Sequence, residues 1–392
     1  MRTPPSQYFS LDEYRQRLDA LRRRMESKGV DAMLVNSPEN LYYLTGYQTP
    51  GYYWFQTLIV PMDREPVFIA RLNESSNIEP LTWIEDSRPY EDRDDWIAHT
   101  GAVLKDLGLD NRRLGLQFDS FFLTIRDERR LMAVLPSATL LDCSGLVEEG
   151  RVIKSPQEIE YMRQAARTAE AGIRAGIDAC RVGVTENDVA AEIHRAQIIA
   201  GSEYTGLPIF IRTGARDAMT HATWYRNTLE PGDSVTIEMP GCINRYHAAM
   251  YRQIYLGEPP ELLLRAREVG KEILQKAKDA IRPGVPAGEI HKLVQDNLLE
   301  ATGPASIRNS RTAYSIGIAF APDWGEGHIL SMTDGEKRPL QAGMTFHLLA
   351  GHVSLQGMEK VKRAVLSDTI LVTENGCETL TGGVEHKLFV KN

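Results

Sequence analysis

Two stretches of the sequence carry side chains suited to moving protons. His221 lies in the polar segment TGARDAMTHATW (213–224), which precedes a predicted strand. A histidine there is either a hydrogen-bonded loop residue or a general base, because imidazole exchanges protons near neutral pH. Glu238 ends the run VTIE, which is typical of a buried strand. A buried carboxylate needs a partner, and that partner is either Arg245 or Arg252, or a cationic substrate.

A third stretch, APDWGEGHIL (321–330), gathers Asp323, Trp324, Glu326 and His328 around two glycines, which indicates a loop or tight turn. Its side chains suit a planar cation. Glu326 can hold such a cation through paired hydrogen bonds, Trp324 can stack on it, and His328 can act as a second acid. The alternative is a solvated loop with one packed tryptophan.

Length and composition narrow the class of protein. The 392 residues are enough for two or three domains. The net charge of −8 disfavours a nucleic-acid partner, which needs a basic face. The four cysteines form no CxxC pair and are expected to be free thiols. The sequence has neither a long apolar run nor the apolar core of a signal peptide, so we expect a cytoplasmic protein with no membrane partner.

The elements that must position these side chains fall into two regions. Over residues 1–150, short apolar runs alternate with amphipathic stretches, which predicts an α/β domain. Its predicted helices are 11–29, 94–107 and 124–136, its predicted strands are 31–36, 41–47, 57–62, 66–74 and 113–117, and a turn is expected at 37–40.

The pattern changes at residue 151. Ser155, Pro156 and Glu158 form a capping-box pattern that predicts the start of a long helix. Two short patterns then recur in the same order: Arg181-Val-Gly183-Val184 matches Arg282-Pro-Gly284-Val285, and Leu229-Glu-Pro-Gly232 matches Leu340-Gln-Ala-Gly343. This repetition predicts that the second domain, residues 151–392, is a duplicated α+β unit with a cleft between its halves.

In combination, several segments resemble the creatinase/prolidase/aminopeptidase P family over nearly the whole chain. They are NSPENLYYLTGY (36–47), RVIKSPQEIE (151–160), RYHAAMYR (245–252), AYSIG (313–317) and SDTILVTENG (367–376). The resemblance implies an α+β protein with an α/β creatinase-like domain at 1–150 and a pita-bread catalytic domain at 151–392. It also implies a homodimer that completes the pocket.

The resemblance further assigns five positions at which metal-dependent members carry Asp, Asp, His, Glu and Glu. This chain has Glu238, Ala249, Tyr314, Leu349 and Ser367 there. A divalent ion needs several converging carboxylates or imidazoles, and only Glu238 can supply one. We therefore predict no metal ligand and no cofactor. Tyr314 and Leu349 should line the vacated space, with His352 beside it.

Loss of the ligands is shared with metal-free creatinase and with the ectoine hydrolases, which this chain resembles most. That resemblance implies a metal-independent hydrolase that opens ectoine, a small zwitterionic amidine, to acetyl-diaminobutyrate. His221 would relay protons and Glu238 would hold the cation. The predicted substrate contacts are Asp323, Trp324, Glu326, His328, Tyr314 and His352.

Several questions stay open from the sequence, including whether the reaction passes through a covalent acyl-enzyme on Glu238 or by direct attack of water. The residue that holds the substrate carboxylate is Arg212, Arg252 or Arg363. One alternative function is a creatinase-type amidinohydrolase that releases urea. Another is a non-catalytic binding protein built on the pita-bread fold.

Overall fold

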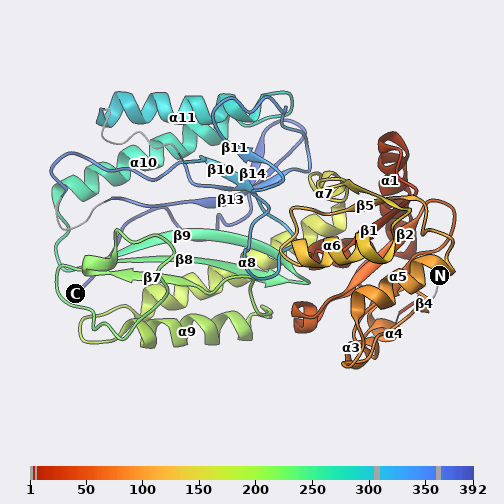
Figure 1. Ribbon diagram of the computed structural model, residues 1–392. Coiled ribbons are helices and arrows are strands. Elements are labelled where there is room, and N and C mark those ends of the chain that lie inside the picture. The colour runs from red at the N-terminus through yellow and green to blue at the C-terminus, as the bar shows by residue number, and fades with distance from the viewer. Residues whose placement is uncertain (1–2, 5–6, 304–309, 359–362) are drawn as a thin grey trace. The chain divides into compact units, whose positions relative to one another are not determined.

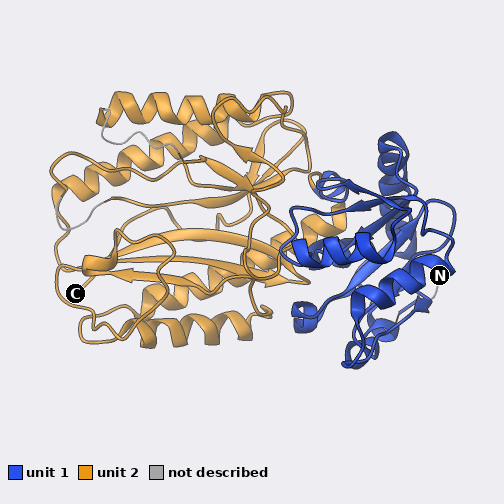
Figure 2. Cartoon of the chain, in the orientation of Figure 1, with its two compact units in different colours: residues 1–151 blue, residues 152–392 orange. Residues whose placement is uncertain are grey.

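The computed structural model describes residues 3–4, 7–303, 310–358 and 363–392. The chain forms two compact units, Met1–Arg151 and Val152–Asn392 (Figure 2). Within the described residues, no helix combines the length and the apolar character needed to cross a bilayer.

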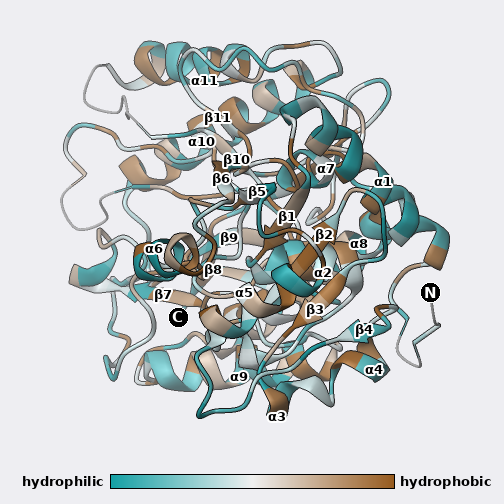
Figure 3. Ribbon diagram, turned by 45° about the vertical axis from the view of Figure 1, so that its right-hand side comes forward, coloured by the Kyte–Doolittle hydropathy of each residue, from teal (hydrophilic) through white to brown (hydrophobic). Residues whose placement is uncertain are grey.

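The first unit is a mixed six-stranded sheet with helices packed around it (Figure 1). The strands run in the order β4-β3-β2-β1-β5-β6, and the central strand β1 pairs antiparallel with β2 and parallel with β5. Figure 3 shows β3 as apolar and most of α1 as polar. The strands are β1 Ala32–Val35, β2 Thr57–Pro61, β3 Val67–Ile69, β4 Asp86–Ser87, β5 Arg113–Leu116 and β6 Thr139–Asp142. The helices are α1 Leu11–Lys28, α2 Pro38–Thr45, α3 Leu72–Ser75, α4 Ile78–Leu81, α5 Trp96–Asp106, α6 Ile125–Val134, α7 Glu148–Arg151 and the 3₁₀ turn η1 Pro50–Tyr53.

Residues 41–47 do not form the predicted strand. They belong largely to α2, which also takes up most of the predicted turn at 37–40. Pro38 occupies the first turn of this helix, where its missing N–H is not needed, and Gly46 ends it with φ 82°. Every residue from Asn40 to Thr45 is buried, so the apolar run reflects a helix enclosed on all sides. The predicted strand 66–74 is also too long, because β3 ends at Ile69 and α3 follows.

The second unit consists of two sheets, each covered by a pair of helices (Figure 1). The first sheet has the order β15-β9-β8-β7 and the second β11-β10-β12-β13-β14. The strands are β7 Phe210–Thr213, β8 Ser234–Ile243, β9 Tyr246–Leu256, β10 Ala313–Ser315, β11 Ser331–Met332, β12 Thr345–Leu348, β13 Asp368–Val372, β14 Cys377–Thr379 and β15 Phe389–Lys391. The helices are α8 Pro156–Ala179, α9 Glu186–Ile199, α10 Glu261–Ala280, α11 Ala287–Thr302 and the 3₁₀ turn η2 Gly214–Arg216.

The two halves of this unit repeat one local structure. In the first half, Gly183 N–H donates to the carbonyl of Leu229, and in the second Gly284 N–H donates to the carbonyl of Leu340, at 2.9 Å each. Both glycines have a positive φ, near 88°, which an L side chain rarely adopts. The repeated sequence pattern therefore encodes a repeated turn that joins each helix pair to its sheet.

Each half also has its own apolar core. One core packs α8 and α9 on the sheet of β7 to β9 and includes Ile173, Ile193 and Ile237. The other packs α10 and α11 on the second sheet and includes Ile273, Val294 and Phe346. The capping box that starts α8 is formed as predicted, with Ser155 accepting from the N–H of Glu158.

Candidate active site

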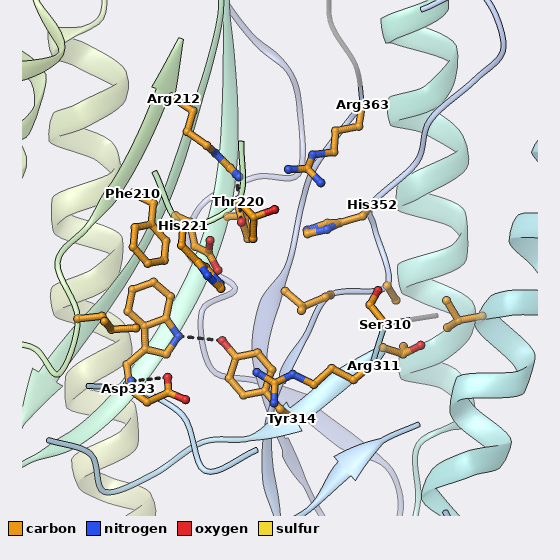
Figure 4. Close-up of a pocket in the computed structure, with 18 of the residues that line it drawn as sticks. Phe210, Arg212, Thr220, His221, Ser310, Arg311, Tyr314, Asp323, His352 and Arg363 are labelled. Atoms are coloured by element: carbon orange, nitrogen blue, oxygen red, sulfur yellow. Dashed lines mark hydrogen bonds between the residues drawn. The ribbon is translucent and has the colours of Figure 1, made fainter. Parts of the chain in front are cut away.

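A cavity of about 640 Å³ lies within the second unit, bordered by elements of both halves. Its volume falls in the range typical of small-molecule pockets. The residues that line it are Leu207, Pro208, Phe210, Arg212, Thr220, His221, Thr223, Glu238, Tyr251, Val294, Gln295, Leu298, Ser310, Arg311, Thr312, Tyr314, Pro322, Asp323, Trp324, Leu349, Ala350, His352 and Arg363. Figure 4 shows Arg212 and Arg363 at one end, Tyr314 and Asp323 at the other, and His221 between them.

Glu238 lies near the middle of β8, directly opposite Tyr251 of β9. Its side chain is buried, and its Oε2 atom has no hydrogen-bond partner among the described residues. Burial raises the pKa of Glu238 to about 7, against the opposing effects of a hydrogen bond with Tyr251 and the charges of Arg212 and Arg363. This carboxyl group is therefore poised between its two protonation states near neutral pH, as a group that exchanges protons requires.

Tyr251 joins Glu238 to a fixed arginine. Arg212 donates from Nη2 to the Tyr251 hydroxyl at 3.0 Å and from Nη1 to the carbonyl of Met219 at 2.6 Å. The Tyr251 hydroxyl accepts from Arg212, so its own proton is free to be donated to Glu238. Burial and the neighbouring Glu238 raise the pKa of Tyr251, which keeps this proton on the phenol.

His221 lies in the loop between β7 and β8 and lines the cavity. Its φ is 56°, a left-handed conformation that costs energy for a residue other than glycine. Its ring centroid is 5.3 Å from that of Phe210, which packs in turn against Trp324 at 4.9 Å. The strained loop thus presents the imidazole beside the ring of Phe210 (Figure 4).

A chain of hydrogen bonds links Trp324 and Tyr314, which line the cavity, to two residues behind them. Trp324 Nε1 donates to the Tyr314 hydroxyl at 2.8 Å, and that hydroxyl lies 2.7 Å from Nδ1 of His347. An indole N–H can only donate, so the Tyr314 hydroxyl accepts from Trp324. The Nε2 atom of His347 lies within hydrogen-bonding distance of the hydroxyl of Ser367, at 2.7 Å. Burial lowers the pKa of His347 to about 3, so the chain is uncharged at neutral pH.

Glu326 and His328, contrary to the prediction, do not line the cavity. The Glu326 side chain is fully buried and accepts from Lys154 Nζ at 2.8 Å and from the Ser315 hydroxyl at 3.4 Å. The charge of a buried carboxylate is balanced by an ammonium partner, so Glu326 and Lys154 form a structural ion pair. His328 is exposed on the loop beyond it. Trp324 and Asp323 of the same segment do reach the cavity.

Three further residues line the cavity, although the sequence patterns above do not predict them. Arg311 stacks on the ring of Tyr314, with its Cζ 4.1 Å from the centroid, and Ser310 and Thr220 add hydroxyl groups. The polar run 310–312 before β10 was the available signal for the first two. Arg252, in contrast, does not line the cavity, because Asp368 pairs with its guanidinium at 3.0 Å inside the protein.

The sequence of this chain matches two protein-family models, which agree with the observed fold. The chain belongs to metallopeptidase family M24, whose family model matches residues 160–374, and the Creatinase/Prolidase N-terminal domain model matches residues 17–153. The predicted family and pita-bread fold are therefore confirmed. The protein is a creatinase-like member of a family of hydrolases.

Among known proteins, the chain is 31% identical over 411 residues to the ectoine hydrolase of Halomonas elongata, with 98% of each protein covered. It is 25% identical to the creatinase of a Bacillus species, over 98% of this chain and 94% of that one. A solved prolidase from Thermococcus sibiricus superposes with a TM-score of 0.85 at 20% identity, covering 98% of this chain and all of the other, which shows the fold alone.

The family implies a metal centre, and the side chains present here do not fit one. Of the five positions that the resemblance assigns to metal ligands, Ala249 and Leu349 have no donor atom. The hydroxyls of Tyr314 and Ser367 are engaged in the chain with His347. No cluster of three or more acidic, histidine or cysteine side chains that could hold an ion occurs in the described part of the protein. Glu238 alone does not supply the several ligands that a divalent ion requires.

Proposed function

We propose that this protein is a metal-independent hydrolase that opens the cyclic amidine of ectoine to acetyl-diaminobutyrate. The observation that carries this proposal is the pair formed by His221 and Glu238 in one cavity, where Glu238 has a pKa of about 7. The similarity to an ectoine hydrolase over 98% of both chains supports the choice of substrate.

An amidinium ion is planar, cationic and electrophilic at carbon, so it suits the middle of this cavity. The buried carboxylate of Glu238 is positioned to attract the cation, and a bound cation in turn favours the ionised form of Glu238. The Trp324 and Phe210 rings, tilted by 45° to each other, line the cavity beside it. Tyr314 and Asp323 form the polar end of the cavity beyond them (Figure 4).

Hydrolysis then needs two proton movements. His221 takes a proton from water as the water oxygen adds to the amidine carbon, and returns it to the ring nitrogen as the C–N bond breaks. The remaining hydroxyl proton leaves as the carbonyl of the acetyl group forms, and the released amine ends as an ammonium group. Glu238 stabilises the cation before addition and, with a pKa of about 7, can carry the second proton.

The decisive experiment is incubation of the purified protein with ectoine, with ring opening followed by proton NMR. We expect the wild-type protein to form acetyl-diaminobutyrate and His221→Ala to lose at least a hundredfold in kcat, because general-base catalysis contributes about that much. His221→Ala must keep the wild-type unfolding midpoint for this comparison. Normal turnover by His221→Ala would refute the role of His221, and no product from the wild type would refute the function.

A creatinase-type amidinohydrolase is the second candidate, supported by 25% identity to a creatinase over nearly the whole chain. Creatine is also a planar cation with a carboxylate, and the cavity is large enough for it. Urea release from creatine, measured beside the ectoine assay, separates the two functions. Homodimerisation stays a prediction, which the molar mass in solution tests.

A further inference from the structure

Two arginines that line the cavity are given no contact with the substrate in the chemistry above. Arg212 comes from β7 and Arg363 from the segment before β13. Figure 4 shows their side chains entering one end of the cavity from opposite sides, with the guanidinium groups directed toward each other. Both also lie close enough to Glu238 and Asp217 to lower the pKa of each carboxyl group by their charge. They therefore create a positive end in a cavity whose middle attracts a cation.

Arg212 is held rigidly and is incompletely satisfied. Its side chain is 1% exposed, and its two Nη atoms donate to Tyr251 and to the carbonyl of Met219. Its Nε atom is buried and has no partner within the described residues. A buried guanidinium that lies at a cavity wall and has an unfilled donor suits an anionic ligand.

Arg363 is anchored through its backbone. The amide of Gln253, a buried residue of β9, donates to the carbonyl of Arg363 at 3.1 Å and accepts from the N–H of Val365 at 3.3 Å. The same amide is fixed by the Ser234 hydroxyl at 2.8 Å. The buried Nε of Arg363 likewise has no partner among the described residues. The backbone is thus tied to β9 while the guanidinium reaches into the cavity.

The nearby acids do not neutralise this pair. Neither Arg212 nor Arg363 forms an ion pair with a described carboxylate. Asp217 accepts from the Thr236 hydroxyl at 2.7 Å, and burial raises its pKa, as it does that of Glu238. Two carboxyl groups that resist ionisation leave a surplus of positive charge beside two permanent cations.

We propose that Arg212 and Arg363 form a clamp for the carboxylate of the substrate. The inference rests on the proposed function for the identity of that substrate, but not for the class of ligand, which is a carboxylate. A substrate held this way lies with its anion between the two guanidinium groups and its amidinium beside Glu238 and Trp324. The clamp makes this enzyme specific for amidines or guanidines that carry a carboxylate.

The kinetic test changes the ligand and the protein together. For ectoine and its primary carboxamide, the wild type should show kcat/KM values that differ by roughly ten- to a hundredfold, as expected for loss of charge-assisted hydrogen bonds. Arg363→Gln and Arg212→Gln should reduce this ratio toward one, mainly through KM, and Arg363→Lys should restore part of it. Arg311→Gln removes a cation from the opposite end of the cavity and should keep the wild-type ratio.

A second measurement does not depend on ectoine. Crystals of the wild type soaked in formate, the smallest carboxylate, should show it bonded to both Arg212 and Arg363, and crystals of Arg363→Gln should not. Formate found there in a protein that does not hydrolyse ectoine would sink the proposed function and leave the clamp intact. If ectoine is hydrolysed but the ratio is unchanged in Arg363→Gln, the clamp is wrong. In that case the arginines serve only Glu238 and Asp217, and the substitution shifts the pH profile alone.

Discussion

Replacing Glu238 with glutamine should stabilise the protein, and by an amount that depends on pH. The folded protein holds the pKa of this buried carboxyl group at about 7, against an ordinary value of 4.5. Between those values the folded state binds more protons than the unfolded state, so the contribution of Glu238 to stability falls as pH rises. Above pH 7, Glu238 is ionised in both the folded and the unfolded state, so its contribution to stability no longer changes with pH.

The magnitude follows from the shift itself. A difference of this size corresponds to about 3 kcal/mol of free energy of unfolding, at 1.36 kcal/mol per pH unit. Glutamine has the same shape and no charge, so Glu238→Gln escapes this cost. We therefore expect the stability of the variant relative to wild type to grow by about 3 kcal/mol from pH 4.5 to pH 8, with most of the change below pH 7.

Urea unfolding followed by circular dichroism at a series of pH values measures this difference. Every other titrating group is common to both proteins and cancels to first order in the comparison. Glu374→Gln, at an exposed position after β13, is the matched control and should show a difference that is flat with pH. A flat difference for Glu238→Gln as well, or one that shrinks with rising pH, would refute the claim that burial dominates at this carboxyl group.

Three further predictions concern the same cavity and its surroundings. Tyr251→Phe removes the hydrogen bond that lowers the pKa of Glu238, so the acidic limb of the kcat/KM profile should move upward by about one to two pH units; an unmoved or downward-shifted limb contradicts the proposed bond. Lys154→Met removes the ammonium partner of the buried Glu326 carboxylate and should cost about 3–5 kcal/mol of stability in urea unfolding. Adding Glu326→Gln to this variant should recover most of that loss and leave KM unchanged. A severalfold rise in KM would show that Glu326 contributes to substrate binding. Exhaustive dialysis against a chelator should leave kcat/KM unchanged, with elemental analysis of the same sample as the control; activity that is lost and then restored by a divalent ion contradicts the proposed chemistry.

The sequence predicted the parts of the fold that local chemistry determines. The capping box at Ser155 and the paired turns at Gly183 and Gly284 are encoded by neighbouring residues, and the structure has them where expected. Residues 41–47 lie largely in a helix where the pattern predicts a strand, because a short helix buried on every side shows the same apolar run as a buried strand. Local pattern alone does not distinguish the two.

The sequence predicts the segment in which a side chain lies better than it predicts the partner that the side chain contacts. The sequence placed Glu326 on the correct loop, but only the fold brings Lys154, 172 residues earlier in the chain, within reach of it. Arg212 and Arg363 are also far apart in the sequence, and they meet because the two halves of the second unit face one cavity. Tyr314 and Trp324 were predicted individually, while the link from Tyr314 to His347 and Ser367 required the register of β10 on β12.

Hydrogen bonds also join the two sheets at positions that the resemblance assigns to metal ligands. A bound metal ion cross-links the strands that carry its ligands. Here the hydrogen-bond chain from Tyr314 through His347 to Ser367 connects β10, β12 and the start of β13. Ser367 also accepts from the N–H of Tyr251 at 3.0 Å, and the hydroxyl of Thr369 bonds the backbone of Ala249 in both directions at 2.8 Å. These hydrogen bonds, together with the buried ion pair of Arg252 and Asp368, hold β9 to the second sheet, while the side chains of His221 and Glu238 line the cavity.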